Sequence, residues 1–359
     1  MTSQDLTGSH STRFFTKTWT PPAGVPVQAQ LLFVHGFIEH IERYDHAFPR
    51  FAQAGIAVFA YDQRGFGRTA TYTPKHSQGV TSWPHQLADL AFWLAHAKSL
   101  HPDVPLFLFG HSMGGGLSLA FPTRTPAHPL VADLAGVVVS SPLIRQAREV
   151  RAHPLIVRAG SLVGKLSGGL RLKAEVKAED CTRDAAAAAA YMSDPLCKQQ
   201  GTFRGVADML LGGEQLLAKD YKNWPKELPL LIVHGDADRV TCHHSSSAFV
   251  DKLHDEVGVR DASFHPFEGY YHEMHNEPGE DKYLELDYIV RWLVSHVPSA
   301  SPSSPGISPG RVSVGTAHTA VDLAEQTAAG KVVAGEAPVT EVELGAAAAA
   351  GGEGRESKL

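Results

Sequence analysis

The sequence PLFLFGHSMGGG at Pro105–Gly116 decides the fold of this chain. Its first five residues form a short apolar run between a proline and a glycine, which predicts a buried strand of a parallel sheet. The glycines and the apolar residues at 117–121 indicate a helix that begins directly after the serine. A G-x-S-x-G sequence between such a strand and such a helix is typical of a nucleophile elbow, the sharp turn that holds a serine hydroxyl above a sheet. Ser112 is therefore the candidate nucleophile.

A serine nucleophile needs a histidine as its base and a carboxylate that orients the histidine. After an elbow of this kind, the two partners follow along the chain in the order acid, then histidine. The acid is expected in the loop after the apolar run 229–233, where Asp238 is preferred over Asp236 because it lies further beyond the end of the strand. The base is expected after the predicted last strand at 262–267, and His272 occupies that place.

Two backbone N–H groups are expected to stabilise the oxyanion that forms when such a serine attacks a carbonyl. One belongs to Met113, which follows the nucleophile. The other belongs to Phe37, which follows the apolar run 31–34 and the turn His35-Gly36. Both predictions rest on position alone, because backbone groups have no side-chain signature.

Four motifs of the chain resemble motifs of the monoacylglycerol lipase family, and the resemblance extends from about residue 12 to residue 297. The elbow is shared with many hydrolases, whereas the E-H-x-x-R-Y and Y-x-x-D-P-L motifs together are far more specific. The resemblance implies an α/β-hydrolase fold with Ser112, Asp238 and His272 as a catalytic triad. It also implies hydrolysis of monoacylglycerol to fatty acid and glycerol through an acyl-enzyme. The four motifs are HGFIEHIERY at 35–44, YDQRGFG at 61–67, GHSMGG at 110–115 and YMSDPL at 191–196.

The resemblance further implies a polar end of the active site, where the glycerol moiety leaves. A short diol needs hydrogen-bond donors and acceptors, whereas an acyl chain needs an apolar channel. For Glu39 and Arg43 the alternative is an i,i+4 ion pair at the start of a helix. Phe37 departs from the family pattern, since a small residue is expected there, and it would narrow the mouth of the oxyanion site. The residues implied at the polar end are Glu39, Arg43, His111, Tyr191 and His275.

Segments with the pattern of strands alternate along the chain with segments that have the pattern of helices. This alternation predicts an α/β protein with a mostly parallel sheet that helices cover on both faces. An antiparallel hairpin at the edge of the sheet is expected at 13–19. The predicted strands are 31–35, 56–61, 105–109, 134–139, 229–233 and 262–267, and the predicted helices lie near 43–54, 84–99, 114–124, 244–257 and 281–296.

The alternation is interrupted at about 142–226, between two of the predicted strands. We expect this segment to form a helical cap inserted into an α/β-hydrolase domain of residues 1–297. Apolar residues recur in the cap at helical spacing from Leu155 to Leu170, with basic residues between them. Two roles are open for this helix. It either lines an acyl channel and makes peripheral contact with a lipid membrane, or it packs its apolar face on its own domain.

Composition narrows the class of protein further. A formal net charge of −6 gives no reason to expect a nucleic-acid partner. The first residues lack the basic start and apolar run of a signal peptide, and no stretch approaches the roughly 18 apolar residues of a transmembrane helix. Three cysteines give no disulfide framework and fit a reducing compartment. The chemistry expected of the triad, with a lipid ester as substrate, requires neither a metal nor another cofactor.

The chain changes character after residue 297. Residues 298–359 are rich in Ser, Pro, Gly and Ala, and we expect them to form a disordered tail. The tail ends in Ser357-Lys358-Leu359, the sequence of a peroxisomal address. This ending predicts binding to the peroxisomal import receptor and a location in the peroxisomal matrix. The cytoplasm and the surface of lipid droplets are the alternative locations.

Other functions remain open at this point. A related hydrolase of the same fold could act on lysophospholipids, on acyl thioesters or on peptides. A non-catalytic scaffold would keep the fold, although such proteins usually lose a member of the triad. A metal site could use His243, His244, His272 and His275, but their spacing matches no known set of ligands.

Overall fold

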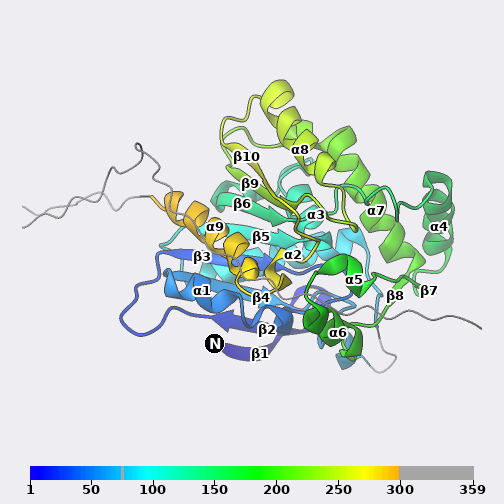
Figure 1. Cartoon of the computed structure of the whole chain (residues 1–359), viewed down its shortest axis with the longest axis horizontal. Coiled ribbons are helices and arrows are strands. Elements are labelled where there is room, and N and C mark those ends of the chain that lie inside the picture. Colours follow the sequence, from blue (N-terminus) through cyan, green and yellow to red (C-terminus); the bar gives the residue numbers. More distant parts are fainter. Residues whose placement is uncertain (74–76, 299–359) are drawn as a thin grey trace, which may run out of the picture. The chain divides into compact units, whose positions relative to one another are not determined.

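A central sheet of eight strands organises the structure, a computed structural model that describes residues 1–73 and 77–298 (Figure 1). The strand order is β1-β2-β4-β3-β5-β6-β9-β10. β1 and β2 form an antiparallel hairpin, β2 also pairs antiparallel with β4, and the other neighbouring pairs are parallel. The predicted α/β class and edge hairpin are therefore confirmed. The strands are β1 (Thr2–Thr7), β2 (Arg13–Trp19), β3 (Ala29–Val34), β4 (Ile56–Tyr61), β5 (Leu106–His111), β6 (Leu134–Ser140), β9 (Leu230–Gly235) and β10 (Ala262–Phe267).

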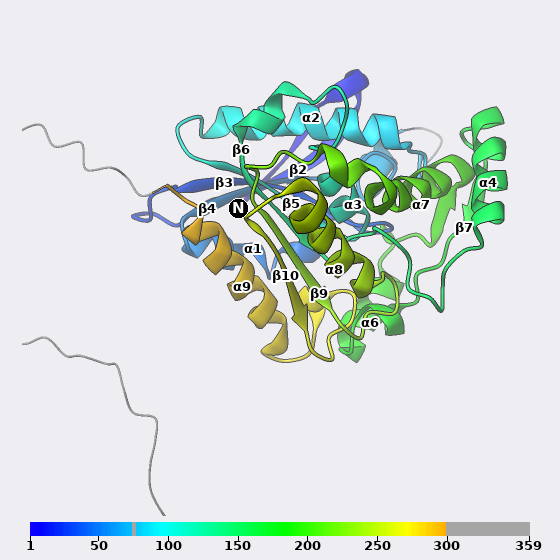
Figure 2. The same ribbon diagram turned by 90° about the horizontal axis from the view of Figure 1, so that it is seen from above.

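Helices cover both faces of the sheet (Figure 2). Side chains alternate between the two faces along each strand. In β3, Leu31 and Phe33 belong to the apolar core formed with α1 and α9, whereas Leu32 and Val34 belong to the core formed with α2, α3 and α8. β3 is buried at every position and therefore has two buried faces. The helices are α1 (Phe48–Gln53), α2 (Trp83–Leu100), α3 (Met113–Ala120), α8 (His243–Lys252) and α9 (Asp281–Ser295).

Prolines account for two helices that differ from their predicted bounds. The predicted helix at 43–54 is a 3₁₀ helix, η2 (Ile41–Tyr44), followed by α1, which has Pro49 in its first turn. A proline is tolerated in the first turn of a helix but not in its interior, so α1 begins only at Phe48. The predicted helix at 114–124 ends earlier, at Ala120, because Pro122 has no N–H to continue the pattern of helical hydrogen bonds.

Between β6 and β9, a segment that the structure describes throughout, the chain forms four α-helices and two short strands. The strands β7 and β8 pair antiparallel with each other, and the sequence pattern does not predict them. The run of alanines at 185–190 begins α6, and the side chain of Asp184 accepts the N–H groups of Ala186 and Ala187 at its start. The elements of this cap are α4 (Pro154–Leu166), β7 (Arg171–Lys173), α5 (Ala178–Cys181), α6 (Ala185–Ser193), β8 (Gln200–Thr202) and α7 (Phe203–Ala218).

Helix α4 exposes its apolar side chains and packs through its glycines. Leu155, Leu162 and Leu166 are 65%, 63% and 91% exposed. On the opposite side, Gly164 lies against the backbone of Arg204 in α7, so closely that a Cβ at Gly164 would be 2.6 Å from both the N and the Cα atom of Arg204. Of the two roles left open for this helix, packing of the apolar face on its own domain therefore does not occur in this structure.

Two further predictions concern membranes and the tail. Within residues 1–73 and 77–298, no helix combines the length and the apolar character needed to cross a bilayer. The predicted tail, with Ser357, Lys358 and Leu359, lies outside the described residues from 299 onward. The structure therefore bears on the predicted domain 1–297 and its cap.

Replacing Phe33 by alanine should lower the free energy of unfolding by about 3–5 kcal/mol, the usual cost of truncating a buried aromatic side chain. The ring of Phe33 is fully buried, and its centroid lies 4.4 Å from that of Tyr44, 4.9 Å from that of Phe48 and 5.0 Å from that of Phe109. Urea titration followed by circular dichroism measures the change. The matched control is Phe92→Ala, because Phe92 is 38% exposed, and its cost should stay below about 1 kcal/mol. Equal losses in the two variants would contradict the packing described for β3.

Candidate active site

Ser112 lies in a sharp turn between β5 and α3. Its backbone has φ 53° and ψ −117°, a conformation that costs a residue other than glycine about 1–3 kcal/mol. A Cβ at Gly110 would collide with the carbonyl of Gly114, and a Cβ at Gly114 would collide with the carbonyl of Val34 in β3. Because only glycine fits these two positions, the sequence G-x-S-x-G is what allows the turn to pack against the sheet.

Asp238 and His272 are joined by a buried hydrogen bond. His272 Nδ1 donates to Asp238 Oδ2 over 2.8 Å, and the N–H groups of Val240 and Thr241 donate to Asp238 Oδ1 over 2.7 and 2.9 Å. Burial alone would raise the pKa of Asp238, but the imidazoles of His272 and His234 hold it well below its usual range. Burial opposes protonation of His272, yet the charge of Asp238 raises the pKa of His272 above its usual value. An ionised Asp238 therefore keeps the proton on Nδ1 and leaves Nε2 free to act as a base.

Asp236, the alternative acid, has a different partner. It is exposed, and its Oδ1 accepts the N–H of Gly269 over 2.6 Å. This bond connects the loop after β9 to the turn after β10, whereas Asp238 contacts the histidine itself. The geometry therefore favours Asp238 as the acid of the triad.

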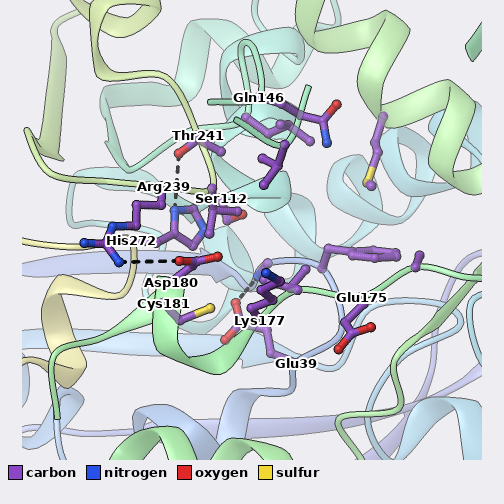
Figure 3. Close-up of a pocket in the computed structure, with 18 of the residues that line it drawn as sticks. Glu39, Ser112, Gln146, Glu175, Lys177, Asp180, Cys181, Arg239, Thr241 and His272 are labelled. Carbon is purple, nitrogen blue, oxygen red and sulfur yellow. Dashed lines mark hydrogen bonds and ion pairs between the residues drawn. The ribbon is translucent and has the colours of Figure 1, made fainter. Parts of the chain in front are cut away.

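Ser112 and His272 line one cavity of about 330 Å³ (Figure 3). The hydrogen bonds that His272 makes with other described residues use Nδ1, with Asp238 and Thr241 as partners. Within the described residues, no hydrogen bond joins Ser112 Oγ to His272 Nε2, although both side chains line the same cavity. Bonds of this kind are often long before substrate binds and tighten in the reacting complex.

Phe37 and Met113 have the backbone positions that an oxyanion hole requires. Met113 is the first residue of α3, so its N–H has no acceptor within the helix. Phe37 follows Gly36, where a Cβ would lie only 3.0 Å from the Cβ of Ser112, so a glycine there lets the end of β3 approach the elbow. Neither N–H group donates to another residue in the described part of the chain. Both are therefore free to bind a developing negative charge.

The side chain of Phe37 reaches from the core to the cap. Its ring packs edge-on against Phe66, with the centroids 5.5 Å apart. On the cap side, its Cζ atom would lie 3.1 Å from a Cβ at Gly201 in β8. Phe37 is thus part of the cavity wall beside the nucleophile, in line with the expectation that it narrows the mouth of the oxyanion site.

A buried cluster of two carboxylates and one guanidinium lies beside His272. Arg43 donates to the two oxygens of Glu273 over 2.7 and 2.6 Å and to Glu39 over 3.0 Å. Burial raises the pKa of Glu39, whereas the charge of Arg43 outweighs burial at Glu273 and lowers its pKa. The predicted i,i+4 pair of Glu39 and Arg43 is therefore present, but as part of a larger cluster. Glu39 and Glu273 line the cavity, while Arg43 is not part of its wall.

The two most specific sequence motifs meet in space. His40 of E-H-x-x-R-Y bonds through Nε2 to Asp194 Oδ2 of Y-x-x-D-P-L over 2.8 Å. The guanidinium of Arg43 lies 4.7 Å from the centre of the Tyr191 ring, a cation–π contact between the same two motifs. These contacts attach helix α6 of the cap to the loop that follows β3.

His40 and Asp194, together with Cys197, are also the described residues whose ligand-type atoms come within 4.8 Å of one another. The 2.8 Å between His40 Nε2 and Asp194 Oδ2 is a hydrogen-bond distance, shorter than the roughly 3.3 Å expected for two ligands of one tetrahedral zinc ion. Burial raises the pKa of the Cys197 thiol, which keeps it in the neutral form that binds metals poorly. The cluster therefore fits a hydrogen bond between core and cap rather than a metal centre.

The remaining residues of the predicted polar end fall into two groups. His111 and Tyr191 line the cavity, whereas His275 is buried outside its wall. The ring of His275 stacks on Tyr44, with centroids 4.5 Å apart, and lies 5.0 Å from the ring of His111. Burial lowers the pKa of His275 to about 3 and that of His111 well below its usual value. Both rings are therefore neutral, and His275 packs against the ring of His111 from outside the cavity wall.

Two residues beside the triad were not singled out by the sequence. His234 Nε2 lies 2.9 Å from Asp238 Oδ2, and the hydroxyl of Thr241 lies 2.8 Å from the same oxygen. The available signal was weak, because His234 is one polar side chain at the end of the apolar strand β9 and Thr241 is a single hydroxyl residue in the loop that follows. Glu273, next to the predicted base, was also missed, because its role depends on Arg43, which is 230 residues away.

Comparisons with known proteins show which family the chain resembles. Residues 25–279 match the family described as "Serine aminopeptidase, S33". A protein of Mycolicibacterium smegmatis named monoacylglycerol lipase is 32% identical over 293 residues, which cover 81% of this chain and 96% of that protein. Monoglyceride lipase of Rattus norvegicus is 29% identical over 79% of this chain and 86% of its own length. A soluble variant of monoglyceride lipase from Saccharomyces cerevisiae, solved in complex with a substrate analog, aligns with a TM-score of 0.73 at 25% identity, over 83% of this chain and 97% of that one.

Asp238→Asn should lower kcat/KM for a soluble ester by about 10³–10⁴-fold, because asparagine neither holds the Nδ1–H tautomer of His272 nor stabilises its protonated form. Asp236→Asn is the matched control, since its amide oxygen still accepts the N–H of Gly269, and it should change kcat/KM by less than about threefold. Initial rates with p-nitrophenyl butyrate measure both effects. A loss in Asp236→Asn as large as in Asp238→Asn would show that the acid is wrongly assigned.

Proposed function

Because the chain belongs to the monoacylglycerol lipase family of α/β-hydrolases, we propose that it cleaves monoacylglycerols to fatty acid and glycerol. One observation supports the proposal more strongly than the others do. The bond between His272 and Asp238, 2.8 Å long, lies beside Ser112 at a cavity whose wall is mostly apolar and carries polar side chains next to the triad. An acyl ester with a small polar alcohol matches that distribution.

The proposed reaction has two halves. Ser112 Oγ attacks the ester carbonyl while His272 Nε2 takes its proton, and the N–H groups of Phe37 and Met113 stabilise the oxyanion. His272 then gives the proton to the glycerol oxygen, which leaves an acyl group on Ser112. Water attacks this acyl-enzyme with His272 again as base, and the fatty acid is released. Asp238 remains ionised throughout and stabilises the protonated His272 in each half.

The two ends of the cavity suit the two parts of the substrate. Glu39, Glu273, His111 and Tyr191 provide donors and acceptors within the wall next to the triad, where the glycerol hydroxyls would bind. The acyl chain would lie against the apolar side chains contributed by the cap and the segment after β6. These are Leu143, Val150, Leu172, Val176, Val206, Met209 and Leu210.

We also propose that α4 makes peripheral contact with the lipid surface in which the substrate is dissolved. Leu155, Leu162 and Leu166 form its exposed apolar side, and Arg158 and Lys165 are exposed on the same helix. A helix with large apolar side chains and basic residues on its surface is suited to the boundary between headgroups and acyl chains. The substrate would then pass from the lipid to the cavity beside the cap.

Ser112→Ala should lower the release of fatty acid from monoacylglycerol by about 10³–10⁶-fold, because no other group forms the acyl-enzyme. Labelling by a fluorophosphonate probe should disappear in the same variant. Both measurements are made on wild type and variant side by side. A variant that retained wild-type turnover would refute the assignment of the nucleophile.

The substrate class is tested on the same wild-type preparation with a panel of monoacylglycerol, lysophospholipid, acyl thioester and aminoacyl amide. Monoacylglycerol should give the highest kcat/KM. Intact labelling of Ser112 together with a clear preference for a thioester, a lysophospholipid or an amide would keep the triad but overturn the substrate. The amide is included because the matching family is named for an aminopeptidase.

Introducing Leu162→Glu and Leu166→Glu together should reduce binding to vesicles that contain monoacylglycerol by about tenfold or more, because two charges would have to enter the apolar part of the interface. Hydrolysis of p-nitrophenyl butyrate in solution should be unchanged, since α4 does not line the cavity. Vesicle flotation measures binding. The release of fatty acid from monoacylglycerol and the hydrolysis of p-nitrophenyl butyrate measure activity. Leu284→Glu on α9 is the control, because Leu284 is also exposed, at 56%, but lies on the domain outside the cap. Equal loss of binding in that control would contradict a role for α4.

A further inference from the structure

Two imidazoles, rather than one, converge on the acid of the triad. His272 Nδ1 lies 2.8 Å from Asp238 Oδ2, and His234 Nε2 lies 2.9 Å from the same oxygen. The side chains of His234 and Asp238 have no exposed surface, and that of His272 is 4% exposed. The mechanism proposed above uses His272 alone, so the role of His234 is unassigned.

The partners of His234 define which of its nitrogens carries the proton. Nε2 faces the carboxylate of Asp238, which can only accept while it is ionised. Nδ1 lies 2.9 Å from the hydroxyl of Ser246 in α8, which can donate to it. A neutral ring with the proton on Nε2 satisfies both contacts. His234 thus presents an N–H dipole to Asp238.

The backbone already fixes the orientation of Asp238, and this matters for the role of His234. The N–H groups of Val240 and Thr241 hold Oδ1, and the hydroxyl of Thr241 lies 2.8 Å from Oδ2. That hydroxyl also lies 3.1 Å from the carbonyl of Ser141, so it has a second acceptor for its one proton. Loss of the His234 side chain therefore leaves the Asp238 carboxylate in place and removes chiefly an electrostatic contact.

We propose that His234 is a positioning residue that limits the basicity of His272 by donating a second N–H to Asp238 Oδ2. The donated proton withdraws part of the negative charge that Asp238 would otherwise direct at His272. A protonated His272 is then less strongly stabilised, and the neutral form needed for attack persists to lower pH. This inference rests on the proposed function, in which His272 is the general base.

The other groups around the two rings do not provide the same effect. Burial alone would lower the pKa of His272, and the negative charges of Asp238, Glu273 and Glu39 raise it. Among the charged groups of residues 1–73 and 77–298, only Asp238 bonds directly to the ring of His272. His234 acts on that strongest contact. The titratable groups that interact with either ring are Glu39, His111, Asp238, His243, Glu273 and His275.

The direction of the pH effect follows from this arrangement. His272 must be neutral to accept the proton of Ser112, so kcat/KM falls as the pH drops through the pKa of His272. In His234→Leu the full charge of Asp238 acts on His272 and raises this pKa. The acidic limb of the pH profile, the range in which kcat/KM falls as the pH drops, should therefore move to higher pH in His234→Leu, by about half a unit to one unit.

The test compares pH profiles of kcat/KM for p-nitrophenyl butyrate in wild type and three variants. His234→Leu removes the donor and should shift the acidic limb. His234→Gln supplies an amide N–H in place of the imidazole N–H and should restore the wild-type position. Ser246→Ala removes a contact of the same ring but leaves Nε2–H in place, so its limb should coincide with that of wild type. A profile of His234→Leu that coincides with wild type, or an equal shift in Ser246→Ala, would overturn the proposal.

A second measurement does not depend on turnover or on the stability of His234→Leu. The ¹⁵N-labelled wild-type protein should show two low-field imidazole N–H resonances, one from His272 Nδ1 and one from His234 Nε2. The second should be absent in His234→Gln. A protonated Nδ1 on His234, or a single such resonance in wild type, would refute the inference. If wild type hydrolyses no ester while both resonances are present, the proposed function fails but the contact with Asp238 stands.

Discussion

The close approach of β3, β5 and α3 at the elbow is the constraint on which the active site depends. Glycines at 36, 110 and 114 remove the Cβ atoms that would collide with the neighbouring backbone or with Ser112. The approach forces Ser112 into its strained backbone conformation, and the same approach places the N–H groups of Phe37 and Met113 beside it. Ser112 keeps this strained conformation because the packed cores on both faces of the sheet surround the turn. The proposed nucleophile and the proposed oxyanion hole are thus consequences of one packing arrangement.

A second layer of contacts links this rigid core to the cap. The bond from His40 to Asp194 and the contact of Arg43 with Tyr191 connect a loop after β3 with helix α6. Arg43 continues this connection to Glu273, the neighbour of His272. A buried guanidinium between two carboxylates is costly to desolvate, and its value here lies in fixing relative positions rather than in stability. The polar end of the cavity is therefore held by residues from three distant parts of the sequence.

Most of the fold could be predicted from the sequence because it depends on local patterns. Apolar runs, helical periodicity and the elbow predicted where most strands lie along the chain and that the fold is of the α/β class. β4 and β10 had their predicted bounds. The bounds of α1 and α3 differed because of Pro49 and Pro122, and β7 and β8 were too short and too polar to show a pattern.

The candidate site was predictable where a residue type has one characteristic position, as for Ser112, Asp238 and His272. It was not predictable where the role arises from a partner far along the chain. Glu273 needs Arg43, and His234 lies in a buried strand whose other residues have no titratable group. Arg43 and His275 were expected on the cavity wall, but the structure places them outside it, since each is already engaged by buried neighbours.

The glycine contact between α4 and α7 has a mechanical consequence. At Gly164 no side chain intervenes between the two helices, so a displacement of α4 is transmitted to the backbone of α7 rather than absorbed by rotamer changes. Met209 and Leu210, both in α7, form part of the cavity wall. Helix α4 and the cavity wall are therefore rigidly coupled, and a force applied to α4 at the surface changes the shape of the cavity.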